Sequence, residues 1–150
     1  MTTEVTQDQL GMLLHLSRDS ALQMLAQWGG FPPFAMRAGN DGAVEVVSNT
    51  QQIDDSKLPE VYERLRSALA EEAKQGGLAA AAIVSNVHLD DAKEGDPFDR
   101  AIQVHVESAS FSRVVMVPYR FPEMIEVKTQ RDVETGEMVP FDAPPAVFAN

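Results

Sequence analysis

Apolar side chains recur every three or four residues between Gln7 and Trp28, the spacing that places them on one face of an α-helix. A capping box formed by Thr6 and Gln9 precedes this run, and two glycines follow it. A second apolar stripe, Val61, Leu65 and Leu69, begins shortly after a proline and also ends at two glycines. The pattern therefore predicts one helix over residues 7–28 and another from residue 59 to about residue 75.

The remaining apolar segments are short, alternating or rich in β-branched residues, as is typical of strands. Strands are expected at residues 34–38, 43–47, 78–89, 101–107 and 111–119, with a further hairpin formed by 124–128 and 138–141. The first pair flanks Gly39-Asn40-Asp41-Gly42, a sequence that favours a hairpin turn. Residues 1–5 and about 142–150 are expected to be flexible ends.

This order of elements predicts an α+β fold in one globular domain covering residues 1–150. We expect a mainly antiparallel sheet of about five strands with two helices packed on it. The order is α-β-β-α-β-β-β, followed by a C-terminal arm or hairpin. Short connections between successive strands favour antiparallel pairing, which is the basis of this prediction.

Charge narrows the range of functions. The chain of 150 residues carries 23 acidic and 12 basic side chains, a formal net charge of −11, and no cysteine. Nucleic acids and anionic membranes are recognised through lysine and arginine, so neither is an expected partner. There is no thiolate chemistry, and no apolar run approaches the length that spans a bilayer. With no signal sequence recognised, a cytoplasmic protein is expected.

A partner surface is predicted from two features. Asp90, Asp91, Glu94 and Asp96 concentrate negative charge between two strands, where they would attract a basic protein or form an ordinary solvated loop. Met12 and Leu16 lie four residues apart on the first helix, away from its main apolar face. They would serve a protein contact, including a homodimer, or be single exposed apolar residues.

A ligand site is predicted on the sheet, at Gln103, His105, Arg113 and Arg120. If the hairpins turn within residues 90–100 and at Ala109, His105 lies opposite about Ser85, and Arg113 lies beside His105. Such a face would accept an anion, although a solvated polar strand face gives the same pattern. We find no catalytic triad, phosphate loop or metal-binding motif, so no catalytic residue, metal or cofactor is assigned.

The aromatic residues Trp28, Phe31 and Phe34 surround two prolines at the end of the first helix. They fit either a latch buried in the core or a groove for a ligand.

The segment Gly-Gly-Phe-Pro-Pro-Phe34, the Asn40-Asp41-Gly42 turn, the strand His105-Val-Glu107 and Val117-Pro118-Tyr119 together resemble a group of small bacterial α+β proteins to which no activity is assigned. The resemblance covers about residues 10–120 and implies no functional residues. The element order is also similar to that of roadblock-type dimeric scaffold domains, although no final helix is found here.

Three functions follow from these observations. The first is a small acidic, non-enzymatic protein-interaction domain, regulatory or inhibitor-like. The second is a small-molecule or anion-binding domain, with or without catalysis, that uses the His105/Arg113 face. The third is a homodimeric scaffold.

Overall fold

The computed structural model describes residues 7–41, 43–47, 58–89, 98–120 and 133–148. Helix α1 spans Gln7–Trp28 and helix α2 spans Leu58–Lys74. The strands are β1 Phe34–Ala38, β2 Val44–Val47, β3 Ala80–His88, β4 Arg100–Ser108, β5 Phe111–Arg120, β6 Glu134–Thr135 and β7 Val139–Asp142. The predicted α+β class and order of elements are confirmed, and most element ends agree within two residues.

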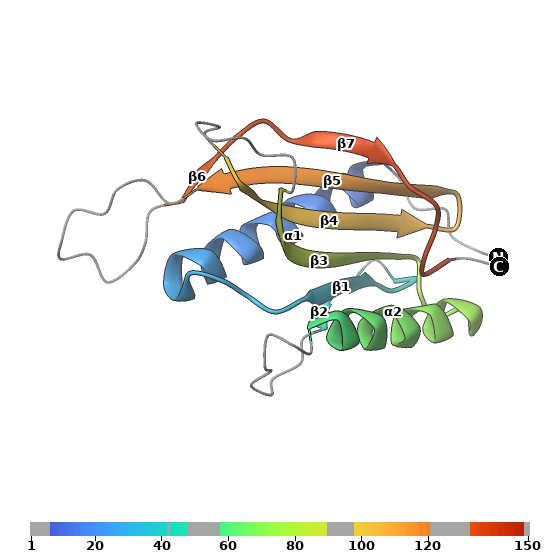
Figure 1. Cartoon of the computed structure of the whole chain (residues 1–150). Coiled ribbons are helices and arrows are strands. Elements are labelled where there is room, and N and C mark those ends of the chain that lie inside the picture. Colours follow the sequence, from blue (N-terminus) through green and yellow to red (C-terminus); the bar gives the residue numbers. More distant parts are fainter. Residues whose placement is uncertain (1–6, 42, 48–57, 90–97, 121–132, 149–150) are drawn as a thin grey trace.

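The strands form one antiparallel sheet in the order β2-β1-β3-β4-β5-β6, and β7 also pairs with β5. Strands β3, β4 and β5 make the long central part of this sheet (Figure 1). The β4–β5 hairpin turns through Ala109 and Ser110, so its register differs by one residue from that of the predicted turn at Ala109. All pairings between the described strands are antiparallel. Side chains directly opposite each other therefore share a face, and the register decides which side chains meet on each face.

The helices cover opposite faces of the sheet. Helix α1 packs its buried residues against Met36, Ala82 and Val104, on what we call the α1 face. Helix α2 packs against Ala35, Ala81 and Ile83, the alternate residues of the same strands, on what we call the α2 face. Helix α1 crosses behind the central strands, while α2 lies along β1 and β3 (Figure 1). The sheet is therefore the middle of three layers.

The predicted helix ends and first turn are also confirmed. Gly29 and Gly76 follow the two helices with φ values of 77° and 79°, a conformation that favours glycine. In the β1–β2 turn, the Asp41 side chain accepts a hydrogen bond of 3.0 Å from the Ala43 backbone N–H. These features could be predicted because each of these residues determines only its own backbone conformation and that of its immediate neighbours in the sequence.

The C-terminal part differs from expectation. Strand β7 pairs with β5, while its expected partner, 124–128, lies outside the described residues. Residues 146–148 are packed rather than part of a free arm: Val147 is 2% exposed and joins the cluster under α2, whereas Pro144 and Pro145 are exposed. The expected flexible end at 1–5 also lies outside the described residues.

Candidate functional site

The residues predicted to form one ligand site are divided between the two faces of the sheet. His105 lies opposite Ile83 on β3 and Val114 on β5, whereas Arg113 lies opposite Val106. The predicted register is therefore wrong by two positions between β3 and β4 and by one position between β4 and β5. The one-position error is the reason that Arg113 is not beside His105. Arg113 belongs to the α1 face, while Gln103 and His105 belong to the α2 face. The anion site expected between His105 and Arg113 is not formed.

His105 is buried on the α2 face. Its Nε2 atom lies 2.9 Å from the Ser112 hydroxyl oxygen and 3.4 Å from a carboxylate oxygen of Glu107. Burial lowers the pKa of His105 below its ordinary value, and the nearby Glu107 carboxylate opposes this only in part. His105 is thus neutral near pH 7 and gives no positive charge for an anion. Its role is a structural hydrogen bond.

Glu107 holds the C-terminal segment in place. Its carboxylate, 1% exposed, accepts hydrogen bonds of 2.9–3.2 Å from the backbone N–H groups of Ala146, Val147 and Phe148. Three amide donors compensate a buried carboxylate that would otherwise be costly. The sequence does not predict this role of Glu107, since a contact across about forty residues leaves no local pattern.

Arg120 lies at the far end of β5 and does not join the other predicted residues. Its guanidinium pairs with Glu134 on β6 at 3.0 Å and lies 5.7 Å from the ring centre of Phe98. It fixes the short strand β6 to β5. Gln103, at the middle of β4, is partly buried on the α2 face.

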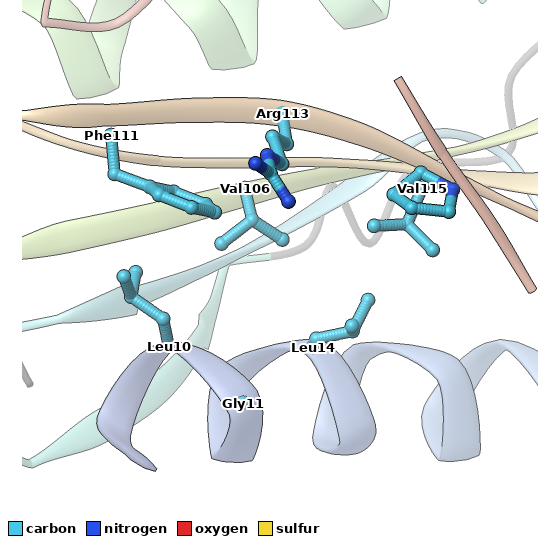
Figure 2. Close-up of a pocket in the computed structure, with 8 residues that line it drawn as sticks. Leu10, Gly11, Leu14, Val106, Phe111, Arg113 and Val115 are labelled. Atoms are coloured by element: carbon cyan, nitrogen blue, oxygen red, sulfur yellow. The ribbon is translucent and has the colours of Figure 1, made fainter. Parts of the chain in front are cut away.

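Arg113 instead borders an apolar pocket between α1 and the sheet. The pocket has a volume of about 310 Å³ and is lined by Leu10, Gly11, Leu14, Val106, Phe111, Arg113, Val115 and Pro140. In Figure 2 the leucines rise from α1, while Val106, Phe111 and Val115 point from the strands toward the helix. Among the described residues of this lining, Arg113 is the single charged one, and its side chain extends over the pocket.

The guanidinium of Arg113 is held loosely. It lies 5.6 Å from the ring centre of Phe111, and its Nε atom is 3.4 Å from a carboxylate oxygen of Asp142 on β7. The two charged side chains are 50% and 94% exposed, so water screens this pair. The arginine is therefore placed by an aromatic ring and an adjustable ion pair.

Gly11 leaves the floor of the pocket open. It is the fifth residue of α1, where glycine costs about 1 kcal/mol relative to alanine. A Cβ atom at this position would meet no heavy atom within 4 Å. Neither a close helix contact nor a positive φ explains the glycine. Its effect is to remove a side chain from the wall of the cavity. A glycine inside an otherwise regular helical stripe was the one available sequence signal for this site.

The other candidate residues are placed as follows. Met12 and Leu16 are 58% and 40% exposed on the outer side of α1, as predicted, whereas Asp90, Asp91, Glu94 and Asp96 lie outside the described residues. The charge distribution around those four acids therefore stays a prediction.

The aromatic cluster is split. Phe31 and Phe34 are buried and meet edge to face, with ring centres 5.6 Å apart, whereas Trp28 is 67% exposed. The latch interpretation is right for the two phenylalanines and wrong for the tryptophan, which lies at the last residue of α1.

Comparison of the chain with models of known protein families, with curated proteins and with solved structures finds no match. The resemblances inferred from the sequence therefore stay predictions. Within the ranges that the structure describes, none of the helices is long and apolar enough to cross a membrane. In the same ranges, no three histidine, aspartate or glutamate side chains gather as metal ligands would.

Proposed function

We propose that this protein binds a small apolar ligand in the pocket between α1 and β5. The observation that carries the proposal is a cavity of about 310 Å³ with apolar walls on two elements and a glycine where the helix faces it. Binding pockets for small molecules begin at about 300 Å³ and combine apolar walls with few polar groups. The proposal develops the second function predicted from the sequence, with Arg113 retained and the other three residues removed from the site.

The size of the cavity suggests the size of the ligand. A cavity of about 150 Å³ accommodates benzene, so this pocket suits a ligand of roughly ten to twelve non-hydrogen atoms. Ligands this small gain about 0.3 to 1.5 kcal/mol per non-hydrogen atom. For the nine non-hydrogen atoms of 1-octanol, about 0.5 kcal/mol per atom corresponds to a dissociation constant on the order of 1 mM, the value that we expect for this probe.

Titration of ¹⁵N-labelled protein with 1-octanol tests this proposal. Saturable shifts are expected at the amides of residues 10–14, 106 and 111–115, which border the pocket. The variant Gly11→Leu places an apolar side chain in the open space and should abolish these shifts while the protein stays folded. His15→Leu adds the same side chain on the exposed side of α1 and should leave binding unchanged. Binding that survives in Gly11→Leu, or shifts spread over the α2 face, would contradict the proposed site.

A protein contact on the outer side of α1 is a second candidate, supported by the exposure of Met12 and Leu16. Met12 also borders a shallow depression with Ala38 and Val44, so apolar surface continues from α1 toward β2. A second copy of the chain or a basic protein would use this surface. Sedimentation velocity at tens of micromolar (on the order of a weak interface) distinguishes the two partners. If the native protein and the Met12→Ser/Leu16→Ser variant both sediment as monomers, the homodimer is contradicted.

A further inference from the structure

We propose that the ligand of the pocket is a small carboxylate with an apolar body, an inference that rests on the proposed function. The apolar body would occupy the space between Leu10, Leu14 and Val115, and the carboxylate would meet the Arg113 guanidinium at the rim (Figure 2). Because Arg113 is the one charged side chain among the described lining residues, this part of the lining offers a partner for an anion and none for a cation.

The geometry of Arg113 suits an exchange of partners. Its guanidinium presents several N–H donors in one plane, which match the two oxygens of a carboxylate. The present partner, Asp142, contacts it at 3.4 Å through the Nε atom and is 94% exposed. A ligand carboxylate can replace Asp142 at little cost, since Asp142 then returns to a position already surrounded by water.

The net charge of the chain does not explain a preference for an anionic ligand over a neutral one. A protein with a net charge of −11 repels anions at long range. Any preference for an anionic ligand over a neutral one of the same shape must therefore come from local groups. Among the lining residues, that group is Arg113.

The decisive measurement is the ratio of two dissociation constants, for 1-octanol and for octanoate, at pH 7.5 and low salt. Both have an eight-carbon chain, and octanoate is ionised at this pH. We expect the native protein to prefer octanoate by about three- to tenfold, the range for a charge-assisted hydrogen bond weakened by solvent. In Arg113→Gln the ratio should fall to one or below. A change in the apolar walls would affect both probes alike and cancel in the ratio, so the ratio reports the effect of charge alone.

Two further variants test the role of Asp142. Asp142→Asn removes the competing carboxylate, so the preference for octanoate should increase by about two- to threefold, in the direction opposite to Arg113→Gln. Glu71→Gln makes the same change in net charge on the exposed side of α2, and the ratio should stay at the native value.

The outcomes distinguish this inference from the proposed function. Equal affinity for the two probes in the native protein, or a preference for octanoate that persists in Arg113→Gln, overturns the carboxylate assignment and leaves the pocket as an apolar site. Failure of both probes to bind overturns the proposed function as well. A rise in the ratio that Glu71→Gln reproduces would show that net charge, and not Asp142, controls the anion.

Discussion

Replacing Glu107 should release the C-terminal segment and destabilise the whole protein. In Glu107→Ala the backbone N–H groups of Ala146, Val147 and Phe148 lose their acceptor. Each hydrogen bond to a charged group contributes about 1.5–3 kcal/mol, but amides that return to water recover part of this. The loss is then limited by undocking of the segment, which exposes Val147, a side chain whose burial contributes about 2 kcal/mol. We expect a total cost of about 3 kcal/mol.

Urea denaturation followed by circular dichroism measures this cost, and a second background shows where it arises. In a chain ending at Asp142, Glu107 has no backbone amides from residues 146–148 to hold, so the same substitution should cost less than about 1 kcal/mol. Glu107→Gln keeps one acceptor oxygen and should lie between the native protein and Glu107→Ala. An equal cost in the full-length and shortened chains would refute the reasoning, because the carboxylate would then act through other contacts.

Three further predictions concern α1, the buried histidine and the aromatic cluster. Gly11→Ala should raise the free energy of unfolding by about 0.5–1 kcal/mol, since alanine favours the helix and its Cβ meets open space. Calorimetry should then show an increase of about 1–4 °C in Tm. Because the folded-state pKa of His105 lies below the ordinary 6.5, the unfolded chain binds the proton more readily. Stability should therefore be complete above pH 6.5 and decrease as the pH falls toward the folded-state pKa. This slope in urea titrations should flatten in His105→Gln, with the exposed His15→Gln as control. Trp28→Ser should change stability by about 0.5 kcal/mol or less, whereas Phe31→Ala should cost about 3 kcal/mol, and similar costs would contradict the split of the cluster.

Much of the fold could be predicted because its signals are local. The stripe of α1, the glycines at both helix ends and the Asp41 turn each specify their own backbone within a few residues. The packing of residues 146–148 could not be predicted in this way. It depends on hydrogen bonds to Glu107, which lies about forty residues earlier in the chain.

The candidate site was predicted only through Arg113. A register error of one residue between β4 and β5 places Arg113 and His105 on opposite faces of the sheet. The error of two residues between β3 and β4 changes only which side chains are neighbours on the same face. The apolar lining was equally hidden, because leucines and valines at core spacing look the same whether they touch or leave a cavity between them. Gly11 differs from these residues because it weakens the helix it belongs to.

Side chains of β4 alternate between the two faces of the sheet, and this alternation affects which strand register is stable. Val106 forms part of the pocket wall on one face, and its neighbour Glu107 receives the backbone amides on the other. If β4 slipped by one position against β3 and β5, a carboxylate would enter the apolar pocket and a valine would face three amide donors. Both faces would be penalised by the same error. These two adjacent residues therefore both favour the native register over one shifted by a single residue.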